Sequence, residues 1–103
     1  MAAYLGEFEQ LILLAVLRLG AGATAASVRS AVEGASQRKV WIGAVHTTLD
    51  RLDAKGLVTS SVAEQPEGRR KVFALTGPGE RAIRHAYATW IRATKGLRLA
   101  RRT

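Results

Sequence analysis

The segment Val40–Val58 constrains the fold of this chain more than any other stretch. Its large apolar residues recur at helical spacing: Ile42, Val45, Leu49 and Leu52. This spacing predicts one helix with one buried stripe, and Gly56 follows where a helix C-terminus favours a residue of positive φ. The opposite side carries small or hydrogen-bonding residues: Gly43, Ala44, Thr47, Asp50, Arg51 and Ala54. Such a face can lie close against a flat or grooved partner.

An N-terminal helix, predicted over about residues 6–19, is apolar around most of its circumference. Its apolar residues are Leu5, Phe8, Leu11, Ile12, Leu13, Leu14, Ala15, Val16, Leu17 and Leu19. A helix that is apolar on nearly all sides is buried on nearly all sides. Because a chain of 103 residues forms one domain with a modest core, we expect a second subunit to supply part of this cover.

Between these two helices, a shorter helix is predicted to begin near Thr24, its candidate N-cap. Val28 and Val32 face inward, and Gly34 is expected to loosen the helix near its end. Residues 40–41 are predicted to form a short extended segment. Two helices joined by a turn, the second with a small polar outer face, are typical of a helix-turn-helix.

The pattern then changes from a helical period to alternation. Residues 58–63 alternate, with several β-branched side chains, which predicts a half-buried strand. A turn is expected at residues 64–68 and a second strand at residues 69–75, with Phe73 and Leu75 facing inward. Three consecutive cations stand beside the hairpin tip: Arg69, Arg70 and Lys71. This charge arrangement is typical of a wing that touches a phosphate backbone.

The last predicted helix runs from about Pro78 to Lys95, with Thr76 as its N-cap. Its apolar residues recur at near-heptad spacing: Ile83, Tyr87, Trp90, Ile91 and Leu97. The tail that follows is rich in arginine and is expected to be disordered. The predicted fold class is therefore mainly α with a small β-hairpin. We expect a winged helix-turn-helix DNA-binding domain over residues 1–76, and a C-terminal dimerisation helix with a basic tail over residues 77–103.

The charge balance points to a polyanionic partner. Sixteen Lys and Arg against eight Asp and Glu give a formal net charge of +8, which is typical of nucleic-acid binding. An enzyme is disfavoured, because no Ser/His/Asp set or phosphate loop is apparent, and no cofactor is indicated. The two histidines, His46 and His85, lie far apart in the chain, and there is no cysteine, so no metal site is expected.

The sequence predicts neither a membrane span nor a secretion signal. The longest wholly apolar run, Leu11–Leu17, is too short to cross a bilayer. Glu7 and Glu9 stand where a signal peptide carries positive charge. We therefore expect a cytoplasmic protein, with membrane-surface binding by the cationic last helix as an alternative.

Several stretches share a family pattern: Leu5–Leu17, Ile42–Leu52, Lys55–Val58, Gly68–Lys71 and Leu75–Thr76 with Gly79. Over roughly residues 4–90 the chain resembles the PadR family of bacterial transcriptional regulators, in its short form with one C-terminal helix. The resemblance implies a homodimeric repressor that binds a palindromic operator through the helix containing Gly43–Lys55 and through the wing. The chain departs from the family pattern at His46, Trp41 and Thr24–Ala25, which leaves the operator sequence open.

The predicted recognition helix supplies the first candidate DNA contacts. Thr47 and Arg51 are expected to meet bases, since Arg can engage guanine bidentately and Thr can meet a thymine methyl. The alternative for Arg51 is an ion pair with Asp50 or a contact near Lys55. Gly43–Ala44 would allow close backbone approach at a helix N-terminus. Further candidates are Ser27, Arg29, Trp41, His46, Arg69, Arg70 and Lys71.

The resemblance also implies that the first and last helices form the dimer. The candidate interface residues are Phe8, Leu11, Ile12, Ile83, Tyr87, Trp90, Ile91 and Leu97. Some members of the family bind aromatic effectors beside a tryptophan of the last helix, so Trp90 is a candidate effector contact, with dimer core as the alternative. Two other functions stay open: a non-specific architectural DNA- or RNA-binding winged helix, and a protein-interaction winged helix, which would not need the cations of the hairpin.

Overall fold

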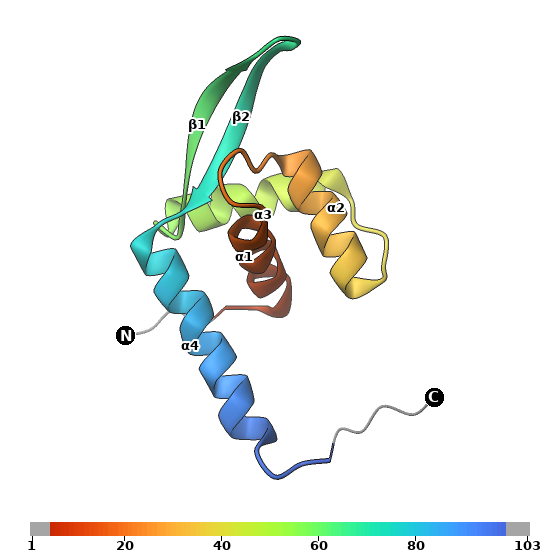
Figure 1. Cartoon of the computed structure of the whole chain (residues 1–103), viewed down its shortest axis with the longest axis vertical. Coiled ribbons are helices and arrows are strands. Elements are labelled where there is room, and N and C mark those ends of the chain that lie inside the picture. Colours follow the sequence, from red (N-terminus) through yellow and green to blue (C-terminus); the bar gives the residue numbers. More distant parts are fainter. Residues whose placement is uncertain (1–4, 99–103) are drawn as a thin grey trace.

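The computed structural model describes residues 5–98, which form four helices and one two-stranded sheet. In chain order the elements are α1 (Glu7–Leu19), α2 (Ala25–Ser36), α3 (Ile42–Ala54), β1 (Val58–Gln65), β2 (Gly68–Leu75) and α4 (Gly77–Thr94). The predicted fold class is confirmed, because the structure is mainly helical with a hairpin between α3 and α4 (Figure 1). The predicted basic tail beyond Arg98 lies outside the described residues.

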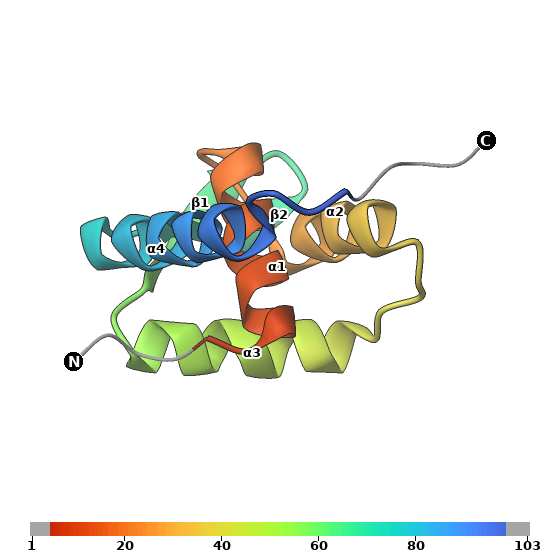
Figure 2. The same ribbon diagram turned by 90° about the horizontal axis from the view of Figure 1, so that it is seen from below.

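Helix α1 lies at the centre of the domain and contacts α2, α3, α4 and β2. Figure 2 shows α3 on one side of it and α4 on the other. Ile12 and Leu13 are fully buried, as expected for a helix that is apolar on most sides. Leu14 and Leu17, however, are 46% and 48% exposed. The chain therefore covers most of α1 and leaves one apolar part of it open.

Helices α2 and α3 form the helix-turn-helix. Thr24 caps α2 as predicted, because its Oγ1 accepts from the Ser27 N–H at 3.1 Å. The helix continues through Gly34, contrary to expectation, since one glycine costs a helix only about 1 kcal/mol. It ends instead at Gln37, which has a φ of 59°. Trp41, in the expected extended segment, has extended backbone and is the N-cap of α3.

The buried stripe of α3 differs from the predicted one at two positions. Val45, Leu49 and Leu52 are fully buried, as predicted. Ile42 is 38% exposed instead of buried, because it is the first residue of the helix and stands at the edge of the core. Thr48 takes a buried place at 4% exposure. The buried side of α3 is thus shifted slightly toward Thr48, and the opposite side of the helix is exposed.

The start of α4 is tied to the loop that follows α3. Gly56 has a φ of 76°, as the sequence predicts. Thr76 caps α4, since its Oγ1 accepts from the Gly79 N–H at 3.0 Å and donates to the Gly56 carbonyl at 2.6 Å. A Cβ on Gly79 would lie 1.9 Å from the Leu57 carbonyl oxygen, so only glycine fits there. These contacts set the direction in which α4 leaves the domain.

The hairpin is anchored at its base and projects at its tip. A two-residue turn, Pro66–Glu67, joins the antiparallel strands and is shorter than predicted. Phe73 is buried at 3% exposure, and its N–H donates to the Ala23 carbonyl at 2.8 Å. The far part of the hairpin extends beyond the helices (Figure 1), and Val62 there is 58% exposed. The hairpin therefore has the form of a wing.

Candidate nucleic-acid interface

The outer face of α3 is exposed along its whole length. As predicted, its six residues are all exposed: Gly43, Ala44, Thr47, Asp50, Arg51 and Ala54. His46 is also exposed, and Trp41 at the N-terminal end of the helix is 76% exposed. The helix thus presents a small and mainly polar surface to any partner.

The first turn of α3 leaves room for a partner. Trp41 supplies no side-chain cap, and its carbonyl accepts from the N–H groups of Ala44 and Val45. The amides before them have no acceptor within the helix. At Gly43 nothing lies within 4 Å of the place where a Cβ would stand. Because free N–H groups at a helix N-terminus attract phosphate, this end suits the close approach predicted for it.

Arg51 stands at one side of the outer face, with its side chain 51% exposed. Its Nη1 lies 3.7 Å from Oε2 of Glu9 on α1, so the partner of Arg51 is Glu9 and not Asp50. Lys55 Nζ donates to the same Glu9 oxygen at 2.9 Å. The sequence pattern does not indicate this cluster, because an acidic residue in a first turn signals only a helix cap.

Glu9 is the only buried ionisable residue among residues 5–98. Its Oε1 accepts from the Gly6 N–H at 3.1 Å, while its Oε2 faces α3. Burial alone would raise the pKa of Glu9. The hydrogen bonds from Lys55 and from the Gly6 amide, with the positive charges of Lys55 and Arg51, outweigh burial and lower this pKa. Glu9 is therefore ionised at neutral pH and joins α1 to the C-terminal half of α3.

A second contact joins α3 to the wing. Ser60 Oγ on β1 donates to Asp53 Oδ2 on α3 at 3.2 Å. Neither residue is recognisable in the sequence for this role, since the contact depends on how the strand packs against the helix. The hydrogen bond helps to fix the wing relative to the outer face of α3.

All three predicted wing cations are exposed. Arg69 Nε lies 3.2 Å from Glu64 Oε2, and Arg70 Nε lies 4.0 Å from Glu67 Oε1. Lys71 Nζ lies 5.7 Å from the centre of the Phe73 ring. Exposed ion pairs contribute only about 0–1 kcal/mol, so a phosphate can compete with these carboxylates for the arginines.

The two candidate phosphate ligands on α2 have partners within the chain. Ser27 Oγ donates to the Thr24 carbonyl at 3.1 Å and accepts from the Thr24 N–H at 2.9 Å. The Ser27 hydroxyl thus completes the cap of α2, and its contact with phosphate stays a prediction. Arg29 Nε lies 3.6 Å from Glu33 Oε2, and the Arg29 side chain is 39% exposed. Arg29 remains a candidate, since a partly exposed ion pair can exchange its carboxylate for a phosphate.

The predicted dimer residues divide into exposed and buried groups. On α4, Tyr87, Trp90 and Ile91 are 67%, 63% and 52% exposed. Ile12 and Ile83, by contrast, are 0% and 5% exposed and belong to the core of the chain itself. The prediction that these two face a partner is wrong. Helical spacing identifies an apolar position but does not distinguish the chain's own core from a subunit interface.

Three further dimer candidates belong neither to the buried core nor to the exposed face of α4. Phe8 and Leu11 are half-buried against the core. Leu97 is 61% exposed, but it follows the end of α4 and the left-handed Gly96, which has a φ of 83°. The apolar stripe of α4 therefore ends before Leu97, although the sequence predicted Leu97 to belong to it. Leu14 on α1, absent from the predicted set, is also an exposed apolar residue.

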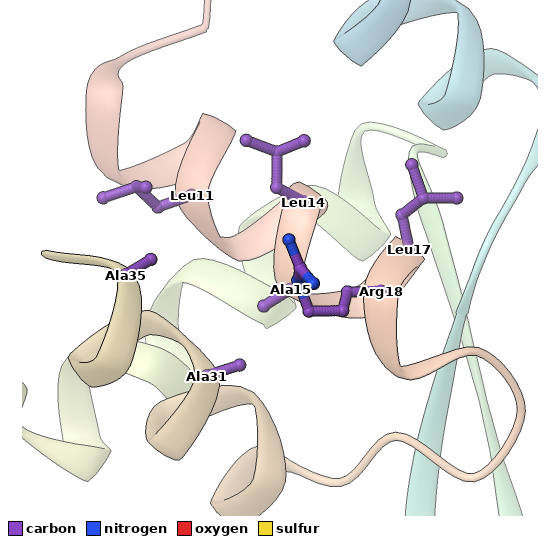
Figure 3. A pocket seen from close by; sticks show the side chains of 7 residues that line it. All are labelled: Leu11, Leu14, Ala15, Leu17, Arg18, Ala31 and Ala35. Atoms are coloured by element: carbon purple, nitrogen blue, oxygen red, sulfur yellow. The ribbon is translucent and has the colours of Figure 1, made fainter.

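An apolar groove of about 340 Å³ lies between α1 and α2. It is lined by Leu11, Leu14, Ala15, Leu17, Arg18, Ala31 and Ala35. Figure 3 shows the leucines projecting from α1 and the two outer alanines on α2. The small alanine side chains keep the groove open, so the uncovered part of α1 is a hollow surface.

The histidines stand apart from each other, and both are exposed. Within the described range, no three His, Cys, Asp or Glu side chains gather where they would hold a metal ion. None of the helices in that range is long and apolar enough to cross a membrane.

A helix-turn-helix with an exposed polar second helix, followed by a basic hairpin, defines a winged-helix DNA-binding protein. The sequence profile described as the transcriptional regulator PadR-like family matches residues 13–85. The chain belongs to this family and is a DNA-binding transcriptional regulator. The resemblance seen in the sequence is thereby confirmed.

Several solved structures share the fold. A PadR family transcription regulator from Clostridium difficile is 21% identical with a TM-score of 0.74, covering 87% of this chain and 93% of that chain. RosR from H. salinarum is 22% identical with a TM-score of 0.76, and the match covers 93% of this chain and 83% of RosR. F93 from STIV, a winged-helix DNA-binding protein, is 18% identical with a TM-score of 0.72, covering 91% and 98%. No curated protein matches the chain significantly.

Proposed function

We propose that the protein is a homodimeric repressor that binds a palindromic operator through the outer face of α3 and through the wing. The observation that carries this proposal is the outer face itself, whose six residues are all exposed and include none of the long apolar side chains of a core. The wing cations stand on β2, and a hydrogen bond from Ser60 on β1 to Asp53 joins the wing to α3.

The contacts divide by chemistry. Thr47 and Arg51 read bases, because both are exposed on α3 and match the thymine methyl and the guanine edge. The amides around Gly43 and the cations of the wing bind phosphates, which positions the helix without reading sequence. Trp41 and His46 lie on the same exposed helix and border the duplex.

The dimer forms through the apolar surfaces of α1 and α4. Tyr87, Trp90 and Ile91 expose large apolar side chains of the kind that mark interaction surfaces, and the open groove beside Leu14 and Leu17 is apolar. Joining such surfaces by a two-fold axis places two recognition helices on one duplex. The symmetry of the operator then mirrors the symmetry of the protein.

A small aromatic effector binds beside Trp90 in this proposal and releases the operator. The indole is 63% exposed and offers a flat apolar face for stacking. Titration with planar aromatic compounds should change Trp90 fluorescence in a Trp41→Phe variant. Trp90 emission that no compound of the panel changes would contradict an effector site beside Trp90.

Selection from a random pool of duplexes tests the function as a whole. The wild type and Arg51→Ala are compared at two salt concentrations. The wild type should enrich a two-fold symmetric site, and the variant should lose it. Binding without enrichment, which simply fades with salt, would contradict the proposal and favour the non-specific architectural DNA- or RNA-binding function. In a reporter assay, the enriched site placed over a promoter should lower expression, as a repressor requires.

A further inference from the structure

Both carboxylate oxygens of Glu9 are used, and they face different elements. Oε1 accepts from the Gly6 N–H at 3.1 Å, which completes the cap of α1. Oε2 accepts from Lys55 Nζ at 2.9 Å and lies 3.7 Å from Arg51 Nη1. The Glu9 side chain is only 10% exposed. Since one oxygen suffices for the cap, the cap leaves the second oxygen and its burial against α3 unexplained.

The two cations that meet Glu9 lie at the end of the recognition helix. Arg51 is in the last turn of α3 and Lys55 is its C-cap. Their side chains remain 51% and 35% exposed, so each reaches solvent while it contacts the carboxylate. Such side chains can meet DNA, but their position is set from within the protein.

We propose that Glu9 is a positioning residue for DNA reading: it holds Arg51 and Lys55 against α1, which fixes Arg51 for base contact and keeps both cations from binding phosphates indiscriminately. This inference rests on the proposed function, because it assigns the base contact to Arg51. Glu9 itself touches no DNA. Its negative charge works through the two cations, and its loss converts them into mobile phosphate ligands.

The direction of the expected effect separates this role from a purely structural one. A residue that only supports the fold weakens binding to every duplex when it is replaced. A residue that restrains two cations should, when replaced, strengthen binding to non-specific DNA and weaken discrimination. Each additional phosphate contact steepens the slope of log affinity against log salt concentration by about 0.9.

Glu9→Gln is the informative variant, because its amide oxygen can still accept from the Gly6 N–H while the negative charge is lost. Glu7→Gln is the matched control. Glu7 is exposed on the same helix, and no ion pair joins it to another side chain in residues 5–98. The two variants change the net charge equally, so a difference between them reports the contact of Glu9 with α3.

The experiment measures the affinity of the full chain for the selected operator and for a scrambled duplex from 50 to 200 mM salt. Glu9→Gln should bind the scrambled duplex about three- to tenfold more tightly at 50 mM salt. The slope of log affinity against log salt concentration should steepen by the equivalent of about one to two phosphate contacts. The ratio of operator to scrambled affinity should fall about tenfold, whereas Glu7→Gln should change this ratio less than twofold. In a Lys55→Gln background, the effect of Glu9→Gln on the slope should shrink, since one of the released cations is gone.

Three results would overturn the proposal. Equal behaviour of Glu9→Gln and Glu7→Gln would show that only net charge matters. If Glu9→Gln loses helicity in circular dichroism and weakens both duplexes equally, Glu9→Asp decides, because it keeps the charge but shortens its reach. Discrimination by Glu9→Asp equal to that of the wild type would then assign Glu9 to the fold alone. A wild type that binds no duplex would overturn the proposed function itself, and this inference with it.

Discussion

The exposed faces of α3 and α4 differ in chemistry although both are open to solvent. The α3 face consists of small and hydrogen-bonding residues, of which Thr47 and Arg51 are the main contact groups. The α4 face carries Tyr87, Trp90 and Ile91, each more than half exposed. Figure 2 shows α1 between the two helices. Exposure alone therefore does not define a site, and the type of side chain indicates which partner each face can bind.

The central helix makes this separation possible. One part of α1 packs through Ile12 and Leu13 into the core, and Glu9 near its N-terminal end accepts a hydrogen bond from Lys55 at the C-cap of α3. Leu14 and Leu17 on another side remain open. The two faces can thus be altered independently, which the following variants exploit.

The largest effect is expected from Trp90→Ala on the α4 face. Loss of a large aromatic from the centre of an interface should weaken the dimer by about 2–4 kcal/mol, roughly 30- to 1,000-fold in Kd. Analytical ultracentrifugation over a concentration series measures this. A variant that stays as dimeric as the wild type would show that the interface lies elsewhere.

Ile83→Ala on the same helix is the control for this variant. Ile83 is 5% exposed and packs in the chain's own core. Its truncation should lower the free energy of unfolding by about 2–5 kcal/mol in urea denaturation. Comparing the two variants separates the loss of a subunit contact from the loss of core packing.

Arg51→Ala should have the next largest effect, on the α3 face. Loss of a bidentate base contact should reduce operator affinity by about 1–3 kcal/mol and leave the dimer intact. Fluorescence anisotropy with labelled operator measures the loss. Arg92→Ala removes an exposed arginine from α4 instead and should leave operator affinity nearly unchanged. Equal losses of operator affinity in both variants would show that Arg51 contributes only its charge and makes no base contact.

A smaller effect is expected from Lys71→Ala in the wing. Loss of one phosphate contact should lower the salt slope by about 0.9 and weaken all sequences by the same factor. Binding to operator and scrambled duplexes at several salt concentrations measures both quantities. Lys95→Ala, an exposed cation after α4, is the control and should leave the slope unchanged. A sequence-dependent loss at Lys71 would mean that the wing reads bases.

The smallest effect concerns acid stability. Because the folded protein lowers the pKa of Glu9 below its ordinary value of 4.5, the ionised carboxylate contributes stability at neutral pH. This contribution is lost as pH falls below the ordinary value and through the lowered one. Urea denaturation from pH 7 to pH 3 should therefore show a steeper loss in the wild type than in Glu9→Gln, with Glu7→Gln behaving like the wild type. Parallel curves for all three proteins would contradict this assignment.

Local signals in the sequence predicted most of the fold. Thr24 and Thr76 cap their helices, and Gly56 takes positive φ, because each of these features depends on a few neighbouring residues. The exposed face of α3 was also predictable, since its residue types are unsuited to a core. The end of α2 was not predictable from Gly34, because a single glycine costs too little free energy to stop a helix.

Contacts between distant segments could not be predicted in the same way. Ile83 and Trp90 both belong to the apolar pattern of one helix, yet only the packing of α4 shows that the first is core and the second exposed. Glu9 carries a capping signal that hides its contact with Lys55. Spacing within an element predicts which side is buried, whereas the partner on that side depends on how the helices pack together.

The separation of the two faces can be measured directly, because each carries one of the chain's two tryptophans. Trp41 is 76% exposed at the start of α3, and Trp90 is 63% exposed on α4. Trp90→Phe and Trp41→Phe give single-tryptophan proteins for fluorescence titration. Operator should change the emission of Trp41 and leave that of Trp90 unchanged, whereas dilution below the dimer Kd should change only Trp90. Operator that changes the emission of Trp90 while Trp41 stays silent would contradict the assignment of α3 to DNA.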